Sequence, residues 1–148
     1  MVLEAGSYAF RAELDISYES ALEMIRSALE EAGLQILAAM NLQEALQGRL
    51  GLEFPHYTIL VTTNLLYAYY ALKAEMEIGT LLPFHIAVYG NVESSTIAIV
   101  DPFSIFGLVE NEELDPIAEQ IESAFQQILE YLVEDYEEEE EIEDEDQV

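Results

Sequence analysis

The stretch from Tyr57 to Asp101 holds three strand-like runs, and this concentration of strands most constrains the fold. The first run covers residues 57–63 and is rich in β-branched side chains, which pack well on a pleated surface. Two further runs, at 84–89 and 96–100, are joined across Gly90-Asn91. Glycine and asparagine tolerate positive φ angles, so this dipeptide predicts a hairpin. We therefore expect a β-sheet at the centre of the chain.

Two amphipathic segments flank these strands. Ser17 is a good N-cap for a helix whose apolar stripe ends at Gly33, a typical residue for a left-handed C-cap. An aspartate followed by proline, Asp115-Pro116, begins a longer apolar stripe that runs to about Val133. We therefore expect one helix before the central strands and a long helix after them.

The remaining segments complete an α+β fold. Alternating residues predict a strand at 7–14, an apolar run predicts another at 34–40, and short helical inserts are expected at 41–50, 65–74 and 103–109. Clustered strands with flanking helices favour two layers, in which helices cover one face of a mainly antiparallel sheet of about five strands, in the order β-α-β-β-β-β-α. The other face is then left to solvent, a ligand or a second subunit.

Charge divides the chain into a body and a tail. The 148 residues include 31 acidic and four basic ones, for a formal net charge of −27, and eleven of the acids follow Val133. We predict a single domain over residues 1–133 and a disordered acidic tail over 134–148, because a run of like charges cannot bury itself. This tail is expected to bind divalent cations only diffusely, since it lacks the ordered loop of a defined calcium site.

The composition also excludes several classes of function. An acidic surface repels phosphate groups, so neither nucleic acid nor an anionic membrane is an expected partner. The chain has no cysteine, which removes disulfides, thiolate nucleophiles and zinc–thiolate sites. Without a signal-peptide pattern or an apolar run of membrane-spanning length, we expect a cytoplasmic protein. Phosphate-binding loops, nucleophile elbows and paired catalytic carboxylates are also missing, so we predict no catalytic residue and no cofactor, and an enzyme is disfavoured.

Six polar or aromatic residues of the central stretch form a candidate ligand site, namely Tyr57, Thr63, Asn64, Tyr69, His85 and Asp101. Tyrosine hydroxyls beside apolar side chains suit a pocket for an apolar ligand, but aromatic residues equally suit strands and homodimer interfaces. Asn64 follows a predicted strand, where it equally suits a helix cap. His56 and His85 are the two imidazoles, and without a metal-ligand spacing pattern around them we predict no metal site.

Short motifs along the chain resemble those of an uncharacterised family, domain of unknown function 302. The motifs that carry the resemblance include Glu44-Ala45-Leu46, Tyr57-Thr58-Ile59-Leu60, Ile78-Gly79, Leu81-Leu82-Pro83 and Asp101-Pro102. The similarity covers about residues 8–109 and part of the final helix. It implies a fold similar to the TATA-binding-protein-like arrangement, often as a homodimer, and it implies no activity.

This chain departs from the pattern of that family at three places. Thr63 and Phe84 stand where the family commonly has cysteine, and the usual Asn-Pro is Asn64-Leu65 here. Thiol chemistry and soft-metal binding are therefore not expected of this protein.

Two functions from different classes follow from these observations. In the first, a non-catalytic α+β module self-associates through its uncovered sheet face or its edge strands, as a homodimer or a larger assembly. In the alternative, a small apolar or mixed ligand binds in a pocket around Tyr57, Asn64, Tyr69 and His85.

Overall fold

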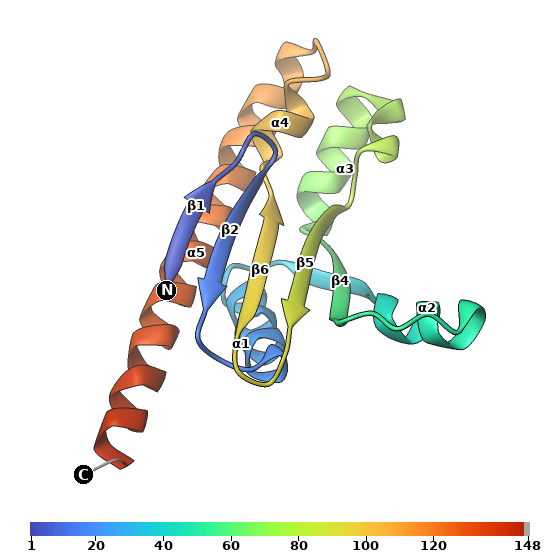
Figure 1. The fold of residues 1–148 in the computed structure, drawn as a ribbon. Helices are drawn as coiled ribbons and strands as arrows, with labels where there is room; N and C mark the ends of the chain where they lie inside the picture. The colour runs from blue at the N-terminus through green and yellow to red at the C-terminus, as the bar shows by residue number, and fades with distance from the viewer. Residues whose placement is uncertain (147–148) are drawn as a thin grey trace.

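The computed structural model describes residues 1–146 and contains one antiparallel sheet of six strands (Figure 1). The spatial order of the strands is β1-β2-β6-β5-β4-β3, so β1 and β3 form the two edges. In chain order the strands are β1 (Val2–Ala5), β2 (Ala9–Leu14), β3 (Gln35–Asn41), β4 (His56–Thr63), β5 (Phe84–Gly90) and β6 (Ser95–Val100). The predicted α+β class with a mainly antiparallel sheet is confirmed.

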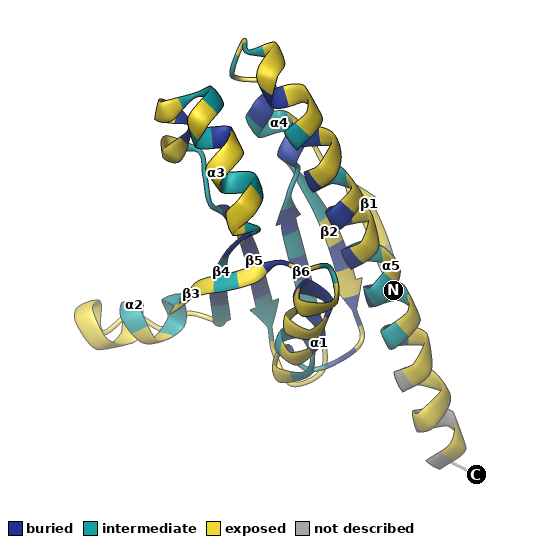
Figure 2. Cartoon of the chain, turned by 180° about the vertical axis from the view of Figure 1, so that it is seen from behind, coloured by how far each residue is buried: buried dark blue, intermediate teal, exposed yellow. Residues whose placement is uncertain are grey.

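Two long helices, α1 (Tyr18–Glu31) and α5 (Asp115–Asp146), lie on the same face of the sheet and contact each other (Figure 2). The shorter helices are α2 (Leu42–Leu50), α3 (Leu65–Ala74) and α4 (Pro102–Phe106), with 3-10 turns η1 (Met76–Thr80) and η2 (Glu112–Leu114). Figure 1, which views the sheet from the opposite side, shows that no helix within residues 1–146 lies over its other face. The sheet is therefore covered on one face, as the order of elements predicts.

The hydrophobic core lies between the sheet and the pair α1 and α5. Along β5 and β6 every second residue is buried, so one face of each strand points into the core. Ile86 and Ile99 on these strands meet Ile25 of α1 and Ile128 of α5 in one buried cluster. Because burial of apolar area is the main stabilising term in folding, these contacts hold the sheet and the two helices together.

Helix starts follow side-chain caps, with one shift from the predicted position. Ser17 Oγ accepts a hydrogen bond from the backbone N–H of Ser20 at 3.1 Å, and Gly33 has φ +75° just after α1, as expected. Asp115, the predicted N-cap of the last helix, is itself helical. Asn111 takes the capping role instead, because it starts η2, which leads directly into α5.

The hairpin between β5 and β6 requires glycine at position 90. Gly90 has φ +148°, and a Cβ atom there would overlap the carbonyl oxygen of Ser94. We expect Gly90→Ala to lower the free energy of unfolding by about 1–3 kcal/mol, because the substitution adds backbone strain and a steric overlap. Urea unfolding followed by circular dichroism measures this change.

Gly48 provides the matched control, since it lies inside α2 and a Cβ atom there would meet nothing within 4 Å. Gly48→Ala should stabilise the protein by about 0.5–1 kcal/mol, because alanine loses less backbone entropy in a helix. Equal effects of the two substitutions would contradict the role assigned to Gly90.

Strand β1 is not predicted from the sequence, and it raises the strand number from about five to six. Its four residues are too few to show an alternating pattern. The strand is specified by pairing with β2, where Leu3 faces Ala12 and Ala5 faces Phe10. The hairpin of β1 and β2 forms one edge of the sheet.

The last helix is longer than its apolar stripe predicts. It continues past the expected end at Val133 to Asp146, so the segment predicted to be a disordered tail is helical up to that residue, while Gln147 and Val148 lie outside the described residues. Glutamate favours helix, and no glycine or proline interrupts this stretch. Tyr136 belongs to the core, and the described side chains after it are exposed. Over the described range, no helix combines the length and apolar content that crossing a membrane requires.

Candidate functional site

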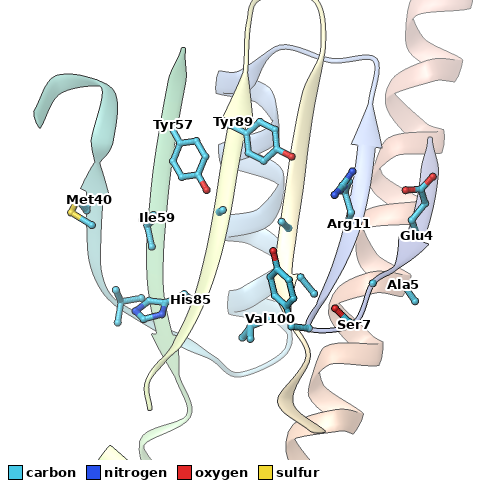
Figure 3. Close-up of a pocket in the computed structure, with 16 residues that line it drawn as sticks. Glu4, Ala5, Ser7, Arg11, Met40, Tyr57, Ile59, His85, Tyr89 and Val100 are labelled. Atoms are coloured by element: carbon cyan, nitrogen blue, oxygen red, sulfur yellow. The ribbon is translucent and has the colours of Figure 1, made fainter. Parts of the chain in front are cut away.

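The uncovered face of the sheet forms a concave cavity of about 830 Å³, which we call the sheet cavity (Figure 3). Its floor is one row of cross-strand partners that runs over β2, β6, β5, β4 and β3, namely Arg11, Ala98, Ala87, Ile59 and Met40. The second and third members of the row, Ala98 and Ala87, have the smallest side chains, so the floor is lowest over β6 and β5. Larger side chains lie on both sides of this row. The cavity forms because these side chains rise above the small alanines of the floor.

A stacked pair of tyrosines forms one wall of the sheet cavity. Tyr57 of β4 and Tyr89 of β5 are direct cross-strand partners, with ring centroids 5.3 Å apart and ring planes at 6°. Phe54 packs edge-on against Tyr57 at 6.1 Å. Both tyrosine rings line the cavity (Figure 3), because their strand positions alternate with residues that point into the core. The wall therefore offers flat aromatic surface beside phenolic hydroxyl groups.

Polar groups lie at the other end of the sheet cavity. His85 of β5 is exposed there, and the hairpin of β1 and β2 contributes Glu4 and Ser7 (Figure 3). Arg11 of β2 is also exposed, and its Nη1 lies 3.9 Å from Glu13 Oε1, with both side chains about half exposed. An ion pair that long and that exposed contributes little, so the guanidinium donors remain accessible to a ligand.

The two histidines occupy different faces of the sheet. His56 is the cross-strand partner of Gly90 and stacks on Tyr18 of α1, with ring centroids 5.0 Å apart, on the covered face. His85 pairs with Val61, toward the other end of the same two strands, and lines the sheet cavity. They form no common site, and no group of three or more potential metal ligands occurs among the described residues.

The six candidate ligand residues separate in the structure. Tyr57 and His85 both line the sheet cavity. Tyr69 lies on α3 instead, where it is exposed, packs edge-on against Tyr70 and sits under the ammonium group of Lys73. Only two of the six residues therefore share a site.

The other three candidates have structural roles at the ends of strands. Asn64 Oδ1 accepts hydrogen bonds from the backbone N–H groups of Leu66 and Tyr67 in the first turn of α3. Its Nδ2 donates to the carbonyl of Gly33 at 3.2 Å. Asp101 caps α4 by accepting from the backbone N–H of Phe103 at 3.0 Å. Thr63 is buried beside Asn64. These contacts fix where α3 and α4 begin and leave the polar atoms outside the sheet cavity.

Arg11 and Tyr89 line this site but are not among the six candidate residues. The period of two could have placed Tyr89 beside His85, since they are four residues apart on one strand and so share a face. To place Arg11 in the site, one must know that β2 pairs with β6, and these strands are distant in the chain. Local patterns do not specify such pairing.

A second surface stands out by its lack of charge. Residues 32–74 contain two acids, Glu44 and Glu53, and two bases, Arg49 and Lys73, so the segment has no net formal charge. The rest of the chain therefore carries the whole formal charge of −27. The segment forms β3, α2, β4 and α3, which lie together on one side of the molecule (Figure 2), and we call this surface the neutral side.

Large hydrophobic side chains gather on the same segment. Among the described residues, sixteen large hydrophobic side chains are exposed, and the nine from the neutral side are Leu37, Met40, Leu50, Leu52, Phe54, Leu65, Leu66, Tyr69 and Tyr70. Helix α2 projects from the edge of the sheet (Figure 1) and has no buried side chain, although Asn41 and Gly51 cap its ends. Gathered apolar exposure of this kind is typical of an interaction surface.

Comparisons with known proteins identify a family and a fold. The family model described as "Domain of unknown function DUF302" matches residues 10–132. The chain is also similar to a solved structure described as an uncharacterized conserved protein DUF302 from Bacillus stearothermophilus, with a TM-score of 0.76 and 23% sequence identity over 86% of this chain and 99% of that chain. At that identity the likeness shows the fold alone. Comparison with curated proteins finds no match.

Proposed function

The chain belongs to the DUF302 family, and we propose that it is a non-catalytic module that forms a homodimer through its neutral side. The membership confirms the family resemblance of the motifs and establishes no activity. The observation that supports the proposal is the separation of charge, which leaves residues 32–74 neutral in a chain of formal charge −27.

Electrostatics favour a second copy of the chain as the partner on this surface. Two copies repel each other strongly unless the surfaces that meet are uncharged. In a two-fold symmetric dimer the same surface patch of both copies forms the interface, so a charged patch would face a patch of the same charge. A basic partner would instead be attracted to the acidic remainder of the molecule. The neutral side is therefore suited to a partner that is itself acidic.

The elements of the neutral side also lack protein contacts that a partner would supply. Helix α2 has nine residues, a length that is marginal in water without packing, and its main contact is with β4. Strand β3 is an edge strand with residues 37–40 exposed, so its outer backbone groups are open to pairing with another chain. Complete burial of a side chain such as Leu50 or Leu52 in an interface would stabilise the dimer by about 1.5–3 kcal/mol relative to leaving that side chain exposed.

Light scattering coupled to size-exclusion chromatography tests the proposal. We expect a dimer at micromolar concentration in moderate salt, and we expect Leu52→Glu to yield a monomer, because the change places a charge inside the interface. Leu52 is 54% exposed in the single chain, so the substitution should leave the fold intact.

The matched control is Leu108→Glu, since Leu108 is also exposed and lies outside residues 32–74. That variant should remain dimeric. A monomeric wild-type protein at micromolar concentration, or equal dissociation by the two substitutions, would refute the neutral side as the interface.

A further inference from the structure

We propose that the sheet cavity binds a small, uncharged, planar aromatic molecule that carries a hydrogen-bond acceptor. The site adjoins the proposed dimer surface at β3 and β4, which supply Met40, Tyr57, Ile59 and Val61 to the cavity. Of the nine exposed hydrophobic side chains of the neutral side, Met40 alone lines the cavity. The inference depends on the cavity's shape, its apolar floor and its balance of charge.

The shape of the sheet cavity suits a flat molecule. Its volume of about 830 Å³ falls within the range of about 300–1,000 Å³ that is common for ligand sites. The floor is lowered along Ala87 and Ala98, and the parallel rings of Tyr57 and Tyr89 stand beside it. A planar ring placed on the alanine floor contacts the sheet with its face and the tyrosine wall with its edge, which is a favourable arrangement of aromatic groups.

Apart from Arg11, the side chains on the floor of the cavity are apolar. Ile59, Val61, Ala87 and Ala98 line the cavity and are each partly exposed. Removing such surface from water is favourable in proportion to the apolar area that is covered. An aromatic body on the floor therefore gains hydrophobic contact that solvent does not provide.

The charges around the cavity favour an uncharged ligand. Arg11 and Glu4 are cross-strand partners that both line the cavity, so their formal charges cancel. The formal charge of −27 on the whole chain repels anions, and a charged group of either sign would lose hydration on the apolar part of the floor, which an uncharged group avoids. Arginine has only donors, so a ligand carbonyl or similar acceptor matches it.

Three naphthalene probes of the same shape test this inference by isothermal titration calorimetry. They are naphthalene-2-carboxamide, the 2-naphthoate anion and the 2-naphthylmethylammonium cation. We expect the uncharged carboxamide to bind most tightly, with one site per chain. Ala98→Leu should weaken its binding by at least about tenfold, because the larger side chain fills the floor.

Three further variants complete the test, and one of them, Leu52→Glu, separates this inference from the proposed dimer. Arg11→Met keeps an unbranched apolar side chain close in length to the arginine stem and removes the donors, so it should weaken the binding of the carboxamide by about tenfold. Leu52→Glu, which is designed to split the dimer, should leave the affinity unchanged. Ala87→Leu provides a second way to fill the floor if Ala98→Leu fails to fold.

Several results would overturn the inference. They are the absence of saturable binding by all three probes, tighter binding of either charged probe, and an affinity unchanged by both leucine substitutions. If the probes fail to bind and Ala98→Leu alters the molecular mass in solution, a second copy of the chain covers this face, and the ligand site is refuted.

Discussion

Replacing Phe84 by alanine is expected to lower the free energy of unfolding by about 3–5 kcal/mol. Phe84 begins β5 and is 1% exposed, with its ring edge-on to Phe106 of α4 at 6.1 Å and to Phe125 of α5 at 5.7 Å. Alanine at this position would leave a cavity where a strand and two helices meet. Urea unfolding followed by circular dichroism measures the loss.

Phe103 of α4 provides the control for this prediction, because the same substitution there removes a ring that is 46% exposed. Phe103→Ala should change stability by less than about 1 kcal/mol, as is usual for sites without a buried contact. A loss at Phe84 no larger than the loss at Phe103 would show that the three rings do not anchor the end of β5.

The position of Phe84 also bears on chemistry. The family that the motifs resemble commonly has a cysteine at this position, whereas this chain has an aromatic ring that packs on two other rings. Thr63, at the other position commonly held by cysteine, is buried and donates its hydroxyl hydrogen to the carbonyl of Asn64 at 3.4 Å. Packing and a local hydrogen bond therefore occupy both places, which agrees with a module that lacks thiol chemistry.

The elements that sequence predicts well are those whose signals are local. The β-branched run at 57–63 and the hairpin at Gly90 appear in the structure as β4 and the turn into β6, because alternation and positive φ depend on neighbouring residues. The cap at Ser17 is predicted for the same reason, since a capping side chain reaches only two or three residues ahead.

What sequence leaves open depends on pairing between distant segments. The sheet cavity exists because Ala87 and Ala98 lie side by side on β5 and β6 with Arg11 next in the row, and the order of strands decides this. From the sequence, Asn64 suits both a ligand site and a helix cap, and its observed hydrogen bonds show the capping role. The capping role of Asp101 is likewise seen only in the structure. The lack of net charge over residues 32–74, by contrast, can be read from the sequence without the structure.

The end of α5 combines burial with strong negative charge. Burial raises the pKa of the Tyr136 phenol above its ordinary value of 10.0, and the Glu140 carboxylate that accepts its hydrogen bond raises this pKa further, whereas a hydrogen bond with the backbone of Asp15 lowers it. The folded state thus favours the neutral phenol. The contribution of the neutral Tyr136 phenol to the free energy of unfolding is fully present below pH 10. It is lost as the pH rises through the higher pKa of the folded state.

Shortening α5 from its C-terminus should separate the part of the helix that stabilises the fold from the part that does not. A chain of residues 1–137 retains Tyr136, which is 2% exposed, and its free energy of unfolding should stay within about 1 kcal/mol of the full chain. A chain of residues 1–133 loses that side chain and should be less stable by about 3 kcal/mol. Thermal and urea unfolding at neutral pH measure both, and Tyr136→Ala in the full chain should reproduce the larger loss. Equal stability of the two shortened chains would show that the buried phenol contributes nothing, and that the stabilising part of the helix ends at Val133.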